Sequence, residues 1–112
     1  MAKPAAEIVV FVTTPSEEEA TTISRSLVEA GLVACANVLP RVRSIFRWEG
    51  KVTEEQESLI VLKTRSGLMK QLEKAIKKMH SYSVPEIIAI PIVQGSEEYL
   101  NWIRDVTSNG LK

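Results

Sequence analysis

Cysteine and histidine are almost absent from this chain, whose 112 residues include one of each, Cys35 and His80. A single cysteine excludes an internal disulfide and is compatible with a reducing compartment. A single histidine excludes the paired histidine spacings that mark many zinc sites. Aromatic residues make up only 5% of the chain, which argues against an RNA-binding sheet that stacks bases on exposed rings.

Neither sign of charge dominates, and long apolar runs are missing. Fourteen basic residues balance fourteen acidic ones, and no basic stripe marks a nucleic-acid partner. The longest apolar stretch near the start, 8–12, is too short for a signal peptide or a bilayer span. We therefore expect no nucleic-acid partner, no membrane insertion and a cytoplasmic location.

The apolar content, 45% of 112 residues, is ordinary for one packed domain. A chain of this length can bury enough surface to fold without a disulfide or a structural metal. We therefore predict one domain over 1–112, with no cofactor required for folding.

Apolar runs and helix signals alternate along the chain in the order βαββαβ, followed by a last helix. Thr14 and Pro15 suit the start of the first helix, and Ser66 suits the cap of the second. Pro91 favours an edge position for the fourth strand. The predicted strands are 8–13, 32–48 with a break at Pro40, 52–65 and 86–93, and the last helix opens at 95–96.

Residues 42–65 are predicted to form a hairpin whose arms are longer than strands in ordinary domains. Glu49, Gly50 and Lys51 supply the turn, where Gly50 tolerates a positive φ. Phe46 and Trp48 near the tip would be costly to leave in water together, which favours a contact between copies of the chain. The alternative is a hairpin that curls back onto its own domain.

This element order predicts an α+β fold, a ferredoxin-like sandwich with both main helices on one face of an antiparallel sheet. The other sheet face then stays uncovered and apolar. Self-association with cyclic symmetry is the simplest way to cover it.

Several separated segments together resemble one family, the CutA divalent-cation-tolerance proteins. The resemblance covers nearly the whole chain in order. The segments that carry it are Val10-Phe11-Val12-Thr13-Thr14-Pro15, Ala34-Cys35-Ala36-Asn37-Val38-Leu39-Pro40, Arg43-Ser44-Ile45-Phe46-Arg47-Trp48-Glu49-Gly50-Lys51, Leu62-Lys63-Thr64-Arg65, His80-Ser81-Tyr82-Ser83-Val84-Pro85-Glu86-Ile87-Ile88-Ala89 and Tyr99-Leu100-Asn101-Trp102-Ile103.

The resemblance implies a ferredoxin-like homotrimer linked to tolerance of copper and other divalent cations, but it does not imply a reaction. It also implies copper-ligand positions at Val12, Met79 and His80. Val12 has no donor atom, and the Met79 thioether is a soft ligand suited mainly to cuprous copper. His80 is therefore the one strong metal-ligand candidate, for copper or another divalent cation.

His80 follows the second predicted helix, where an exposed imidazole could bind a metal. The alternative is a helix-end histidine that is hydrogen bonded to a carbonyl. Tyr82 and Glu86 flank Pro85 and could line the same loop wall as ligand-binding residues. Otherwise Tyr82 packs against the fold and Glu86 is a surface charge.

Cys35, Lys63 and Trp48 are the remaining ligand-binding candidates. Cys35 lies among small apolar residues and could instead be buried as a small hydrophobe. The Lys63 ammonium either contacts an anion in a cleft or extends to solvent. Trp48 either stacks on a ligand or anchors a contact between copies.

Taken together, the sequence favours a homotrimer that binds a metal ion or a small anionic ligand in clefts between copies. An enzyme is not expected, because a phosphate-binding glycine loop, a nucleophile with a recognisable base and a metal-ligand pair are all missing. A trimeric signalling or scaffold protein that organises a partner, without a direct metal role, is the alternative.

Overall fold

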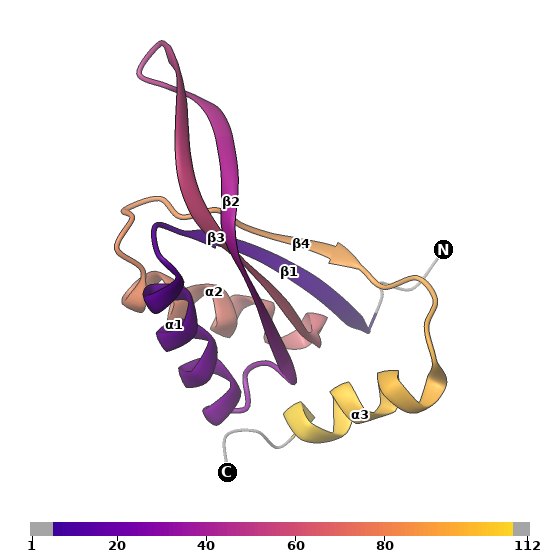
Figure 1. Cartoon of the computed structure of the whole chain (residues 1–112). Coiled ribbons are helices and arrows are strands. Elements are labelled where there is room, and N and C mark those ends of the chain that lie inside the picture. Colours follow the sequence, from indigo (N-terminus) through magenta and orange to yellow (C-terminus); the bar gives the residue numbers. More distant parts are fainter. Residues whose placement is uncertain (1–5, 109–112) are drawn as a thin grey trace.

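The computed structural model describes residues 6–108 as one four-stranded antiparallel sheet with helices packed on it (Figure 1). The strand order β2-β3-β1-β4 is that of the predicted ferredoxin-like sandwich, so the α+β prediction is confirmed. The elements are β1 (Glu7–Thr14), α1 (Glu17–Glu29), β2 (Cys35–Trp48), β3 (Lys51–Arg65), the 3₁₀ turn η1 (Ser66–Leu68), α2 (Met69–Met79), β4 (Ile87–Pro91) and α3 (Glu97–Ser108).

The core lies between the sheet and helices α1 and α2, which share one face (Figure 1). Strand residues alternate between the two faces of a sheet, and in β1 the side chains Ile8, Val10 and Val12 face the helices and are buried. Ile60 and Leu62 of β3 join them. None of the helices in the described range is long and apolar enough to cross a membrane.

The hairpin of β2 and β3 extends well beyond the rest of the sheet (Figure 1). Its arms have 14 and 15 residues, so the predicted long arms are confirmed. Glu49 and Gly50 form a two-residue turn with φ of 51° and 80°, the positive values that a type I′ hairpin turn requires. The projecting part does not curl back: Ile45, Trp48 and Val52 are each more than 60% exposed.

The sheet face opposite α1 and α2, here called the open face, is covered only at one end. Residues that alternate with the core residues, such as Val9 and Phe11, point to this face. Helix α3 packs over its end, where Arg65 donates hydrogen bonds to Thr107 and the Arg104 guanidinium pairs with the buried Glu7 carboxylate. The prediction of a fully uncovered face was therefore wrong, because it gave α3 no packing partner.

Two predicted helix starts differ from the structure. Ser16, not Thr14, caps α1: its Oγ accepts the Glu19 backbone N–H at 3.1 Å, while the Thr14 hydroxyl donates to the Ser16 carbonyl at 2.7 Å. Ser66 opens the 3₁₀ turn η1, and α2 begins only at Met69. The fourth strand is also shorter than predicted and ends at the edge-strand Pro91.

Candidate functional site

Lys63 and Cys35 lie side by side on the open face, in register across β3 and β2. The Lys63 Nζ donates to Asn37 Oδ1 and lies 3.9 Å from the Cys35 sulfur. The sulfur in turn lies 3.7 Å from Asn37 Oδ1. The structure therefore brings an ammonium, a thiol and a carboxamide together, here called the Lys63 cluster.

Helix α3 closes one side of the Lys63 cluster through Tyr99. Burial, and then the neighbouring Cys35, raise the pKa of the Tyr99 phenol. Tyr99 also stacks on Trp102 at a ring distance of 5.4 Å. Both rings remain more than 40% exposed, so the cluster has an aromatic rim beside open surface.

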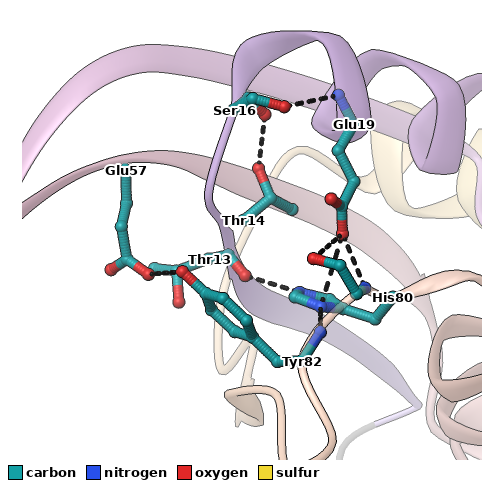
Figure 2. A network of polar contacts seen from close by, with 8 residues as sticks. Thr13, Thr14, Ser16, Glu19, Glu57, His80 and Tyr82 are labelled. Carbon is teal, nitrogen blue, oxygen red and sulfur yellow. Dashed lines mark hydrogen bonds and ion pairs between the residues drawn. The ribbon is translucent and has the colours of Figure 1, made fainter.

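His80 is buried at the end of α2, and both of its ring nitrogens are occupied (Figure 2). Its Nε2 lies 2.7 Å from the Thr13 carbonyl oxygen, which can only accept, so the ring proton is on Nε2. Its Nδ1 accepts the Tyr82 backbone N–H at 3.0 Å. The expectation of an exposed imidazole was wrong, and the carbonyl-bonded alternative describes the ring. Its role as a metal ligand stays a prediction.

Glu19 of α1 ties the same loop to the first helix (Figure 2). Its Oε2 accepts both the backbone N–H and the hydroxyl of Ser81, at 2.9 and 3.0 Å. The same oxygen lies 3.5 Å from His80 Nδ1. An imidazole nitrogen and a carboxylate oxygen therefore face each other at the start of the loop.

Tyr82 is held against β3 by a carboxylate that the sequence did not single out (Figure 2). Its hydroxyl donates to Glu57 Oε2 at 2.8 Å, and Glu57 is only 8% exposed. Burial, the hydrogen bond to Glu57 and nearby carboxylates raise the pKa of the Tyr82 phenol. The Tyr82 ring also packs on His80, with ring centres 4.9 Å apart.

Glu86 and Trp48 do not join either group of residues. Glu86 is exposed just before β4, and Trp48 lies next to the hairpin turn with 63% of its surface exposed. The predicted group of His80, Tyr82 and Glu86 is therefore not formed. In the structure His80 and Tyr82 lie beside the carboxylates of Glu19 and Glu57 instead. A ligand role for Glu86 and Trp48 remains a prediction.

Sequence reasoning missed Asn37, Tyr99, Glu19 and Glu57. Asn37 could have been found, since it lies two residues from Cys35 on the same strand and so on the same face. Glu19 belongs to the acidic first turn of α1, whose local pattern indicates only an interaction with the helix dipole. Glu57 and Tyr99 depend on tertiary packing, which no local pattern reports.

A ready-made metal site is not evident in the part of the chain that the structure describes. No group of three or more His, Cys, Asp or Glu side chains there could hold a metal ion. Val12 is fully buried in the core, and Met79 packs against that core. A metal bound by one copy would therefore have to recruit donors by rearrangement or from another copy.

The model of the CutA1 divalent ion tolerance protein family matches residues 8–106. The chain belongs to the CutA family. A CutA divalent-cation tolerance protein of Thermus thermophilus is 48% identical over 101 residues, which cover 90% of this chain and 98% of that protein. The CutA protein of Arabidopsis thaliana is 41% identical and covers 96% of this chain, but the chain spans only 59% of its length.

Solved CutA structures have the same fold. The T. thermophilus structure has a TM-score of 0.89 over 90% of this chain and 98% of that chain. The structure from Archaeoglobus fulgidus is 40% identical with a TM-score of 0.87, over 90% of this chain and 98% of that chain. The A. fulgidus protein is described as periplasmic and the Arabidopsis protein as chloroplastic. Because these compartments differ, a cytoplasmic location stays a prediction.

Proposed function

We propose that this CutA-family protein acts as a homotrimer in divalent-cation tolerance and binds a small anionic ligand in clefts between copies, on the open face. The observation that carries the proposal is the Lys63 cluster. Its ammonium is half-buried and, within residues 6–108, pairs with no carboxylate. The role is one of binding, without a reaction.

Self-association supplies the cleft. The open face and the projecting hairpin expose large apolar side chains that water disfavours, among them Leu39, Ile88 and Ile90 on the face and Ile45 and Trp48 on the hairpin. A covering copy would remove water from Lys63 as well. Burying an ammonium without a partner is costly, so an anion held between the copies stabilises the covered state.

Anion titration tests the proposal. We expect inorganic phosphate or citrate, followed by calorimetry, to bind the wild-type protein. Replacing Lys63 by Gln should weaken that binding by about tenfold or more, because a charge-assisted hydrogen bond is lost. The matched control is Lys70→Gln on the exposed surface of α2. Equal affinities for both variants, or no binding at all, would contradict an anion site at Lys63.

Direct copper binding is a second candidate, which the His80 and Glu19 pair favours. An imidazole nitrogen and a carboxylate oxygen 3.5 Å apart are suitable donors for a divalent cation. Binding there requires the Tyr82 N–H to leave Nδ1 and the loop after His80 to move. Copper titration of the wild type and of His80→Ala tests this candidate. Loss of binding in the variant supports it, and identical isotherms would remove His80 from the metal role.

A further inference from the structure

A hollow lies on the helix-covered side of the sheet, opposite the Lys63 cluster, between α1 and the start of edge strand β2. It is a surface groove with a volume of about 330 Å³. The groove is open to solvent, so it would contact a small molecule from one side only. The lining residues that matter here are Ser24, Arg25, Val28 and Glu29 of α1, and Ala36 and Val38 of β2.

Opposite charges in this groove are present but do not neutralise each other. Arg25 and Glu29 lie one helical turn apart, at a spacing where side chains can meet. Within residues 6–108 neither makes a hydrogen bond or an ion pair through its side chain. The groove therefore carries an exposed guanidinium and an exposed carboxylate one helical turn apart.

Ser24 adds a buried hydroxyl without a partner. Its residue is only 7% exposed, and its Oγ is the only buried side-chain nitrogen or oxygen in the described residues that lacks a hydrogen bond. A buried polar atom without a partner costs free energy, and such atoms are rare. Ser24 lines the groove, but its Oγ has almost no accessible surface, so it meets a bound polar group only when the side chain rotates about the Cα–Cβ bond.

Apolar side chains complete the groove. Val28, which is 44% exposed, faces Ala36 and Val38 of the strand. Together they offer a surface for a small aliphatic group next to the two charges.

We infer that this groove binds a small zwitterion, an α-amino acid with an aliphatic side chain. Its carboxylate would pair with the Arg25 guanidinium, a geometry that guanidinium groups favour. Its ammonium would face Glu29, with the Ser24 hydroxyl as a further partner. Its side chain would cover Val28 and Val38. This site is separate from the anion site on the open face, and the inference does not depend on that proposal.

The test uses L-leucine and two analogues that each lack one charge, 4-methylpentanoate and 3-methylbutylamine. Binding is followed by chemical-shift changes of backbone amides in the full chain. We expect leucine to shift amides of α1 and of β2 near Ala36, and to bind about tenfold or more tightly than either analogue, since each analogue loses one charge-assisted contact. Equal affinity of leucine and 4-methylpentanoate would overturn the zwitterion inference in favour of a simple anion site.

Three variants and one matched control locate the site. Arg25→Gln and Glu29→Gln should each weaken leucine binding by about tenfold, whereas Glu18→Gln, on the same helix but outside the groove, should not. Ser24→Ala should weaken binding without lowering the stability of the free protein, because the hydroxyl it removes has no partner there. No amide shifts with leucine, or equal binding by all variants, would overturn the inference.

Discussion

At the residue scale, single hydrogen bonds fix how the loops meet the helices. Ser16 is the clearest case, since its hydroxyl satisfies a backbone N–H that the first turn of α1 cannot pair. The acidic run Glu17–Glu19 then complements the positive end of the helix dipole. The sequence pattern predicted an N-cap in this segment but placed it at Thr14. Thr14 and Ser16 are both good N-cap residues, and only the path of the backbone after Pro15 decides between them.

Replacing Ser16 by Ala is expected to lower the free energy of unfolding by about 1 kcal/mol, as loss of an N-cap usually does. Thr22→Ala on the exposed surface of α1 is the matched control and should be neutral or slightly stabilising, since alanine has the higher helix propensity. Urea denaturation monitored by circular dichroism measures both. A larger loss for Thr22→Ala than for Ser16→Ala would contradict the assignment of the cap.

Tyr82 makes the stability of the protein depend on alkaline pH. Its pKa is raised above the ordinary value of 10.0, so the folded chain keeps a proton that the unfolded chain loses above that pH. Stability from this group is therefore complete below pH 10 and falls as pH rises further. Tyr82→Phe should be less stable than the wild type at pH 8, where Glu57 loses its partner, but should lose less stability between pH 8 and pH 11.

Denaturation curves at several pH values measure this difference. Because the lysines titrate in both proteins, only the difference between the two curves reports Tyr82. Parallel declines in the wild type and the variant would show that Tyr82 keeps its ordinary pKa.

At the element scale, the hairpin and its turn follow from local sequence. Glu49 and Gly50 are the two central residues of a turn in which both φ values are positive; Gly50 adopts its value without strain, whereas Glu49 does so at some cost. The alternating residues on both sides then fix the register from Trp48 and Lys51 back to Val42 and Glu57. This part of the fold was predictable because it depends on neighbours in the chain.

Other elements were not predictable to the same degree. Strand β4 ends at Pro91, sooner than its apolar run, because its partner β1 begins at Glu7, whose carbonyl already accepts the Ile92 N–H at 3.1 Å. Helix α3 shows an apolar stripe, but nothing local reveals that it packs over Glu7 and Arg65 on the open face. The polar groups around Lys63 and Tyr82 likewise combine residues from distant elements, so only their strand and loop positions could be anticipated.

Gly50→Ala tests the turn. The added Cβ meets nothing within 4 Å, so any effect comes from the backbone at φ of 80°. We expect a loss of about 1 kcal/mol and faster hydrogen exchange in the hairpin. Gly67→Ala, whose Cβ would meet only the end of the Arg65 side chain at 3.8 Å, is the control and should change little. Equal effects of the two substitutions would contradict a conformational role for Gly50.

At the scale of the whole molecule, one copy leaves too much apolar surface in water. The hairpin exposes Ile45, Trp48 and Val52, and the open face exposes Ile88 and Ile90. The hairpin projects beyond the core (Figure 1), and the open face lies on the opposite side of the sheet from helices α1 and α2. The proposed association of copies would cover both surfaces without rearranging the core.

A charge on the open face should therefore weaken assembly and leave the protomer folded. Ile88→Glu places a carboxylate on that face, and Val93→Glu places one outside the sheet at a site that is 84% exposed. We expect a smaller mass in solution for Ile88→Glu, an unchanged mass for Val93→Glu, and circular dichroism like that of the wild type for both. An unchanged mass for Ile88→Glu would show that this face takes no part in assembly.

The mass of the wild-type protein in dilute solution, measured by light scattering at micromolar concentration, tests the central claim most directly. Three copies of a 12.5 kDa chain are expected to move as one particle of three times that mass. A folded, stable particle of 12.5 kDa would contradict the account, because clefts between copies would then not exist.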